Sequence, residues 1–124
     1  MAFNWQKPTV EMLGRWQPWH RGHTELFKRA VAKTGQVVIM VRDVHRTKGN
    51  PFGLVEVIRK IDSALEAEGY KNGEQYIIKR VPNIVDISYG RDVGYSITEH
   101  DLGSDIHSIS ATKIREQMRE AGEL

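Results

Sequence analysis

Two histidines, His20 and His23, are the residues whose type and spacing most clearly suggest chemistry, and Gly22 lies between them. A predicted helix begins here, so residues three apart share one face of its first turn. Unpaired backbone N–H groups at a helix start attract phosphate, both imidazoles can donate hydrogen bonds to it, and Gly22 has no Cβ to keep it away. The pattern indicates a phosphate site. Two solvated histidines in a capping loop are the simpler interpretation, and the three-residue spacing without an intervening glutamate disfavours zinc.

A second cluster of phosphate-binding residue types lies near the end of the sequence. Ser110 is a favourable N-cap for the last predicted helix. Thr112, Lys113 and Arg115 then fall in the first turn and a half, where cations are unfavourable unless an anion is bound nearby. These residues indicate a second anion site, although an ordinary capped helix with solvated cations has the same pattern.

The predicted elements that position these clusters alternate between strands and helices. The uninterrupted apolar run at 37–41 is typical of a strand buried on both faces. The alternation predicts an α/β fold, a Rossmann-like three-layer α/β/α sandwich with a mainly parallel sheet, whose right-handed crossovers bring both clusters to one sheet edge. In the N-terminal arm, only Trp5 is expected to be buried. We predict strands at 8–13, 36–41 and 76–81, weaker extended stretches at 84–87 and 95–98, helices at 21–33, 53–68 and 110–120, and loops at 42–50 and 99–108.

Composition and charge exclude several classes of protein. With 124 residues, 40% hydrophobic and 27% charged, the chain is expected to form a single domain over residues 1–124. It has no apolar run near the roughly 18 residues of a membrane span and no signal-peptide core, so a cytoplasmic protein with no membrane partner is expected. The absence of cysteine excludes disulfides and thiolate nucleophiles. The net charge of +2 comes from dispersed cations, which favours an anionic small molecule over nucleic acid as the partner.

Both clusters match one known family. The segment 14–23, Gly-Arg-Trp-Gln-Pro-Trp-His-Arg-Gly-His, resembles the G-R-F-Q-P-x-H-x-G-H start of the HxGH nucleotidyltransferase superfamily. The segment 109–115, Ile-Ser-Ala-Thr-Lys-Ile-Arg, resembles its closing I-S-x-T-x-I-R signature. The resemblance implies transfer of a nucleotidyl group from a nucleoside triphosphate to a phosphate or phosphonate on a small acceptor, with release of pyrophosphate.

The resemblance also implies roles for individual residues. His20 and His23 would contact the triphosphate and stabilise the transition state at the α-phosphate. Thr112 and Arg115 would bind the β- and γ-phosphates, and Lys48 would close over them unless it is simply a solvated loop cation. Mg²⁺ would accompany the nucleotide, held mainly by its phosphates, and a homodimer is expected because relatives are often dimers. The other candidate nucleotide-binding residues are Gly14, Arg15, Trp16, Gly22 and Ser110.

Two closer resemblances within the superfamily indicate which nucleotide and acceptor the protein uses. Residues 14–18 and the Asn50-Pro51-Phe52 segment look like archaeal nicotinamide mononucleotide adenylyltransferases, which use ATP. The compact length instead looks like glycerol-3-phosphate cytidylyltransferase, which uses CTP and a small acceptor. We therefore expect transfer of CMP from CTP to a small acceptor. An ATP-dependent adenylyltransferase is the alternative, and a non-catalytic nucleotide sensor is a further one.

The acceptor candidates lie around the first cluster and in two loops. Trp19 flanks the histidines, Asp43 follows the second strand, and Arg91 lies in the glycine-containing segment 89–95. The simpler interpretations of these three features are that Trp19 is merely buried, that Asp43 is an ordinary loop aspartate, and that the segment 89–95 is a plain turn. Arg46 competes with the loop lysine for the catalytic role.

Overall fold

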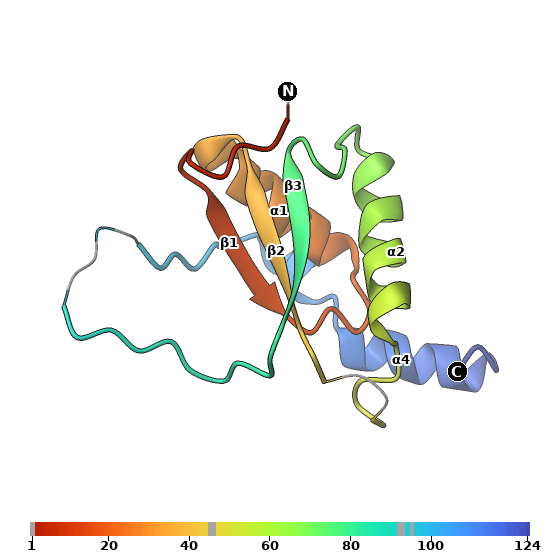
Figure 1. Ribbon diagram of the computed structural model, residues 1–124. Coiled ribbons are helices and arrows are strands. Elements are labelled where there is room, and N and C mark those ends of the chain that lie inside the picture. The colour runs from red at the N-terminus through yellow and green to blue at the C-terminus, as the bar shows by residue number, and fades with distance from the viewer. Residues whose placement is uncertain (1, 45–46, 92–93, 95) are drawn as a thin grey trace.

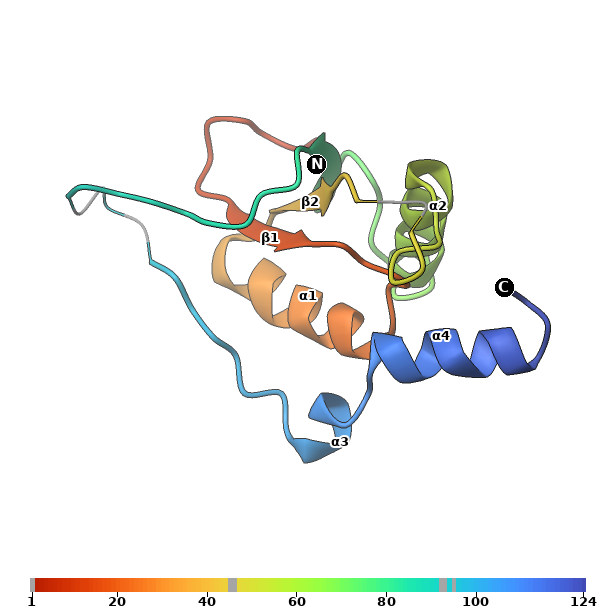
Figure 2. The same ribbon diagram turned by 90° about the horizontal axis from the view of Figure 1, so that it is seen from below.

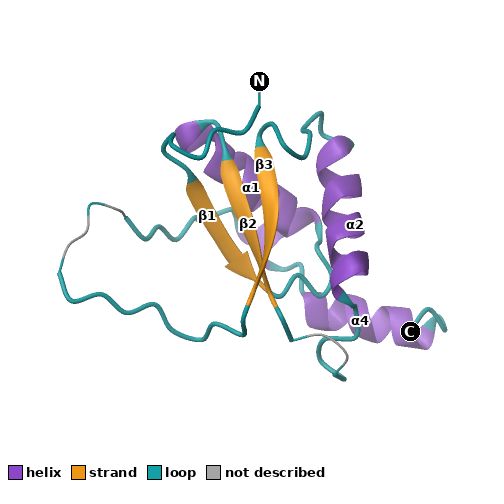
Figure 3. Ribbon diagram, viewed as in Figure 1, coloured by secondary structure: helices purple, strands orange, loops and turns teal. Residues whose placement is uncertain are grey.

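The computed structural model describes residues 2–44, 47–91, 94 and 96–124, with a parallel sheet flanked by helices (Figure 1, Figure 3). The strands and longer helices lie within two residues of their predicted bounds. None of the helices in these ranges has the length and apolarity needed to cross a membrane. The elements in chain order are β1 (Val10–Gly14), α1 (Arg21–Thr34), β2 (Val37–Arg42), α2 (Leu54–Glu66), β3 (Tyr76–Val81), α3 (Ser104–His107) and α4 (Ala111–Glu120).

The sheet has the order β1-β2-β3, and both strand pairs are parallel. The register aligns Met12 with Ile39 and Ile39 with Ile78, so the carboxyl ends of the strands lie at one edge. Two right-handed crossovers in the same direction place α1 and α2 on the same face of the sheet (Figure 2). This arrangement confirms the predicted α/β, Rossmann-like class with a parallel sheet. Within the described ranges no helix covers the opposite face, where the prediction places a third layer.

The main core lies between the sheet and this helical layer. The alternate residues of β2 that face the helices are at most 3% exposed: Val37, Ile39 and Val41. They belong to one cluster with Phe27 of α1 and Ile61 of α2. Val38 and Met40 point to the other face and are only half-buried, so the expected burial of this strand on both faces is not confirmed. The physical reason is the missing helical cover on that side.

The segment after β3 differs most from the prediction. Residues 84–87 and 96–98 form no strand, and residue 95 lies outside the described residues. An extended segment becomes a strand only where its backbone pairs with a neighbour. Residues 84–87 instead pass beside Leu13 without entering the ladder of β1. The predicted loop 99–108 contains the short helix α3.

The prediction that Trp5 is buried was wrong, because its side chain is 72% exposed. The arm is fastened by Gln36, whose side chain is buried and reaches the backbone of Asn4. The Gln36 amide nitrogen donates to the Asn4 carbonyl at 2.6 Å, and its oxygen accepts from the Asn4 N–H at 3.0 Å. The buried Gln36 side chain therefore attaches the N-terminal arm, whereas the sequence suggested that burial of the Trp5 ring would do so.

Candidate active site

The carboxyl ends of the strands and the amino-terminal ends of α1 and α4 meet at one edge of the sheet (Figure 1, Figure 2). β1 ends at Gly14, and a short loop leads from there into α1. Nη1 of Arg115, near the start of α4, donates to the backbone carbonyl of Gln17 in that loop at 2.5 Å. These two residues are 98 positions apart in sequence. The fold therefore joins the two clusters that the sequence predicts at one edge.

The two histidines form the cap of α1. Their rings stack with centroids 3.7 Å apart. The N–H of Gly22 donates to Nδ1 of His20, and the N–H of His20 donates to Nδ1 of His23, each at 3.0 Å. A neutral imidazole carries its proton on the nitrogen that does not accept. Both rings therefore present Nε2–H as a hydrogen-bond donor.

Burial lowers the pKa of His20, and burial followed by the neighbouring His20 lowers the pKa of His23 to about 3. Both rings are neutral near pH 7, in agreement with the role of each Nδ1 as an acceptor. The histidines thus offer directed hydrogen bonds to an anion without adding charge. Positive charge at this edge has to come from other residues.

Lowering the pH from about 7 to about 5 is expected to reduce the free energy of unfolding. The folded histidines have pKa values below the unfolded value of about 6.5, so the unfolded chain binds more protons below that pH and stability falls with pH. For His23 the loss continues toward its folded pKa of about 3, with a slope approaching about 1.4 kcal/mol per pH unit. Urea unfolding across this range measures the effect.

The matched variants for this prediction are His23→Gln and His100→Gln. Glutamine at residue 23 can still accept the hydrogen bond of the capping box but does not titrate. We expect the free energy of unfolding to change less steeply with pH in His23→Gln than in the wild type. His100→Gln controls for loss of a histidine outside the cap. An equal slope in wild type and His23→Gln would contradict the lowered pKa.

Two glycines leave room for rings at this edge. A Cβ at Gly22 would lie 2.8 Å from Cε1 of His20 and 3.4 Å from Ile106 of α3. A Cβ at Gly14 would lie 2.7 Å from the ring of Trp16. Both glycines are therefore required by the packing of neighbouring side chains, a reason that the sequence pattern does not reveal.

The two tryptophans of this loop are each 6% exposed. Trp16, a candidate nucleotide-binding residue, packs beneath the loop, and its Nε1–H donates to the carbonyl of Met40 at 3.0 Å. Nε1–H of Trp19 donates to Oγ1 of Thr24 at 2.8 Å, and its ring lies 5.4 Å from that of His23. Burial accounts for Trp19, so its position does not support the predicted contact with an acceptor.

The start of α4 carries concentrated positive charge. Oγ of Ser110 accepts from the N–H of Lys113, which confirms the predicted N-cap. Nη2 of Arg115 donates to Oγ1 of Thr112 at 3.2 Å, and its Nη1 bond to the α1 loop fixes the guanidinium between the motifs. Burial first, then the nearby Arg119 and Arg15, lower the pKa of Arg115. Such crowding of cations is relieved when an anion binds among them.

The loop between β2 and α2 is attached to α4. The backbone carbonyl of Lys48 accepts a hydrogen bond from Nη2 of Arg119. The Lys48 side chain is exposed, in a turn in which Thr47 and Asn50 exchange backbone hydrogen bonds. The fold thus attaches the backbone of this loop to Arg119 in the last turn of α4. Arg46 lies outside the described residues.

Two acceptor candidates lie in other surroundings. Asp43 forms an ion pair with Arg80 at 2.7 Å, which fits the simpler interpretation of an ordinary aspartate. Arg91 is exposed, and the segment that carries it extends away from α4 in both views (Figure 1, Figure 2). Residues 92, 93 and 95 of the same segment lie outside the described residues. The described structure does not bring Arg91 to the paired helix starts.

Sequence reasoning missed Gln17, which is 4% exposed. Its side-chain Nε2 donates to the carbonyl of Phe52, and its Oε1 accepts from the Phe52 N–H, each at 2.9 Å. The backbone carbonyl of Gln17 accepts a hydrogen bond from Arg115. One residue therefore holds the α1 loop, the segment that starts α2, and α4. The signals in the sequence are that Gln17 matches the glutamine of the family motif and that its amide lies among aromatic residues and proline.

Replacing Gln17 with leucine is expected to lower the free energy of unfolding by about 2–4 kcal/mol. The change leaves the buried N–H and carbonyl of Phe52 without partners, at about 1–3 kcal/mol for each. Gln75→Leu removes an amide whose bond to Lys71 is exposed, and it should cost less than about 1 kcal/mol. Denaturant unfolding compares the two variants, and equal losses would contradict the role assigned to Gln17.

Across the described ranges, no group of three or more histidine, aspartate or glutamate side chains is arranged to hold a metal ion. The geometry fits phosphate recognition by neutral donors, arginines and two helix starts.

The fold and the joined motifs define the class of protein: the chain belongs to the HxGH nucleotidyltransferase superfamily. It is 36% identical over 69 residues to the nicotinamide-nucleotide adenylyltransferase of Methanococcus vannielii, covering 54% of this chain and 38% of that protein. It is 36% identical over 74 residues to the enzyme of the same name from Ignicoccus hospitalis, covering 58% and 43%. No family model matches the chain.

Similarity extends to a second adenylyltransferase. The chain is 33% identical over 84 residues to the phosphopantetheine adenylyltransferase of Cereibacter sphaeroides, covering 68% of this chain and 50% of that protein. The chain spans half or less of the length of these curated relatives. All three relatives are named as adenylyltransferases, which favours the ATP alternative over the expected preference for CTP.

Proposed function

We propose that this protein transfers an adenylyl group from ATP to the phosphate of a small acceptor and releases pyrophosphate. The observation that carries the proposal is the 2.5 Å contact between Arg115 and Gln17, which joins the two helix starts. One helix start presents two Nε2–H donors, and the other presents Arg115 and Thr112. A triphosphate has enough anionic groups to be bound by both helix starts at once.

In the proposed reaction, an acceptor phosphate oxygen forms a bond to the α-phosphorus of ATP. The bond from that phosphorus to the oxygen bridging to the β-phosphate breaks, and its electron pair leaves with pyrophosphate. The acceptor oxygen is already anionic, so no general base is required. His20 and His23 would donate to the α-phosphoryl oxygens, where negative charge increases in the transition state.

Arg115 and Thr112 would bind the phosphates that depart as pyrophosphate. Mg²⁺ would come with ATP, held mainly by its phosphates, and would neutralise part of their charge. Lys48 is proposed to approach the same phosphates, since its loop is attached to α4 through Arg119. These cations do not distinguish adenine from cytosine, so the choice of ATP rests on the relatives.

Pyrophosphate release tests the proposal. ATP and CTP are each incubated with Mg²⁺ and with nicotinamide mononucleotide, 4′-phosphopantetheine or glycerol 3-phosphate. We expect release with ATP and at least one acceptor, and less with CTP. Background release in every combination would refute the enzyme, and ATP binding without turnover would instead support the nucleotide sensor.

A further inference from the structure

The face of the sheet that lacks helical cover, here called the open face, carries an apolar strip. On all three strands the residues that alternate with those of the core point to this face. The half-buried apolar side chains among them are Leu13, Val38, Met40, Ile77 and Val81. Single apolar residues scattered over a surface are ordinary, but a gathered patch indicates an interaction site.

The N-terminal arm adds an aromatic ring to the open face. Lys79 alternates with Ile78, which packs against the core, so the Lys79 side chain points to the open side of β3. Its Nζ lies 5.3 Å from the centroid of the Trp5 ring. Trp5 is nevertheless 72% exposed. Tryptophans are enriched among the residues that anchor protein–protein interfaces.

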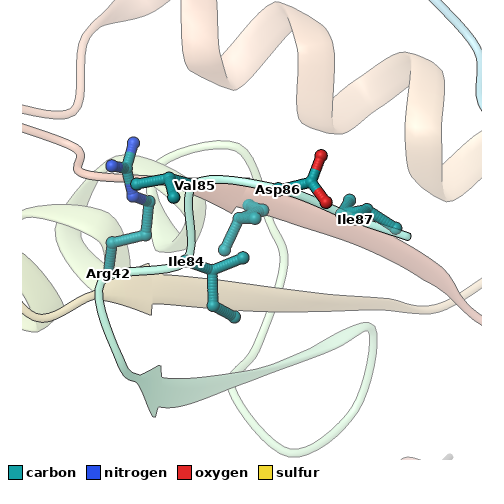
Figure 4. A pocket seen from close by; sticks show the side chains of 6 residues that line it. Arg42, Ile84, Val85, Asp86 and Ile87 are labelled. Atoms are coloured by element: carbon teal, nitrogen blue, oxygen red, sulfur yellow. The ribbon is translucent and has the colours of Figure 1, made fainter.

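The segment after β3 extends the patch at the carboxyl ends of the strands. Residues 84–87 line a pocket of about 410 Å³ together with Leu13 and Arg42 (Figure 4). Val85 and Ile87 in this segment are 82% and 52% exposed. The apolar patch therefore reaches from the N-terminal arm, across the strands, to this segment.

Two exposed residues of opposite charge flank the strip. Glu11 lies on the open side of β1, one outer strand, and Lys79 lies on the open side of β3, the other. Among the described residues, Glu11 has no ion-pair partner. The open face thus carries a negative charge on one outer strand and a positive charge on the other, with apolar side chains between them.

We propose that the open face is the interface of a homodimer, in which two copies of this chain pack open face to open face. The inference does not depend on the proposed reaction. A two-fold axis parallel to the strands, between the two sheets, places β1 of each copy opposite β3 of the other. Glu11 of one copy then faces Lys79 of the second copy, and the pair occurs twice. A two-fold interface requires such self-complementarity.

The spacing of the strands permits this pairing. Packed sheets lie about 10 Å apart, which a glutamate and a lysine side chain span together. Glu11 is level with Ile77, so its offset from Lys79 along the strands is two residues, or about 6.6 Å. A two-fold axis across the strands would instead place β1 on β1 and β3 on β3, which brings like charges together. Charge therefore favours the first arrangement.

The central strand supplies a second reason for a second copy. The uninterrupted apolar run of β2 is typical of a strand buried on both faces, yet Val38 and Met40 are only half-buried in the single chain. In the proposed dimer, β2 of each copy lies opposite β2 of the other. The second copy would therefore bury the side of β2 that no helix covers.

Charge reversal tests the interface in the intact chain. Sedimentation velocity over a range of concentrations is expected to show a dimer of the wild type. Glu11→Lys and Lys79→Glu should each raise the dimer dissociation constant by about tenfold or more, because each sets like charges against each other. The double variant should recover most of this loss, since the pair is restored with its signs exchanged. Both positions are exposed, so the fold should be unaffected.

The matched control is Glu66→Lys, which makes the same charge change at the end of α2, on the other side of the sheet. It should leave the dissociation constant unchanged. A wild type that stays monomeric at every concentration would overturn the proposal, and so would a dimer that responds equally to Glu11→Lys and to the control. A double variant as weak as the single ones would overturn the two-fold arrangement.

A second pair of variants tests the apolar part of the patch. Trp5→Ala removes an exposed ring from the open face and should raise the dimer dissociation constant by about tenfold or more. Val55→Ala shortens a side chain that is 67% exposed on α2 and should have no effect. Equal dissociation constants for these two variants would contradict the placement of Trp5 in the interface.

Discussion

Replacing His23 with alanine is expected to lower kcat for pyrophosphate release by about 10²–10³-fold, the usual cost of losing one donor to a developing oxyanion. The Nδ1 atom of His23 is occupied by the N–H of His20, so Nε2–H is the donor that the variant removes. The effect should fall on kcat more than on the KM for ATP, because charge on the α-phosphate increases only in the transition state.

Stability has to be measured alongside this change, because His23 also caps α1. Loss of the cap should cost about 1 kcal/mol, which leaves a folded protein if the wild type has ordinary stability. His23→Gln keeps an acceptor for the cap and a shorter donor, so its kcat should lie between those of wild type and His23→Ala. A folded His23→Ala protein with wild-type turnover would show that His23 has no role in catalysis.

Replacing Arg115 with alanine is expected to lower kcat/KM for ATP by about 10–100-fold, which corresponds to about 1.5–3 kcal/mol for hydrogen bonds to a charged group. The guanidinium bridges Gln17 and Thr112, so it is already oriented before any phosphate binds. Arg115→Lys keeps the charge but loses the planar guanidinium that bonds Gln17 and Thr112 together. Its kcat/KM should therefore fall by an intermediate factor.

The matched control for this prediction is Lys71→Ala. Lys71 lies in the turn before β3, at the opposite edge of the sheet, so the control removes one positive charge without touching the site. Steady-state kinetics with varied ATP should show no change in that control. Equal losses in Lys71→Ala and Arg115→Ala would mean that overall charge, and not the joined helix starts, attracts the nucleotide.

Local features of this molecule could be read from neighbouring residues. The apolar run of β2, the helical spacing in α2 and the Ser110 cap each depend on residues within a few positions of one another. The three parallel strands followed from the alternation of these elements. The two phosphate-binding motifs were visible for the same reason, because each is a short run at a helix start.

Contacts between distant segments were not predictable in this way. The Gln17 side chain meets Phe52, 35 positions away, and nothing near either residue indicates the pair. The exposure of Trp5 depends on whether another segment covers it, and the Gln36 contacts to Asn4 hold the arm without such cover. The pocket near Arg42 likewise forms only because residues 84–87 cross the open face of the sheet.

The sequence by itself determined the three strands, the three longer helices, the Ser110 cap and the two motifs of a nucleotidyltransferase, because periodicity and capping act over a few residues. The tertiary structure decided which nitrogen of each histidine carries the proton, how Arg115 is held, and which face of the sheet remains open. These features depend on which surfaces pack together, and a free-energy balance over the whole chain selects that packing.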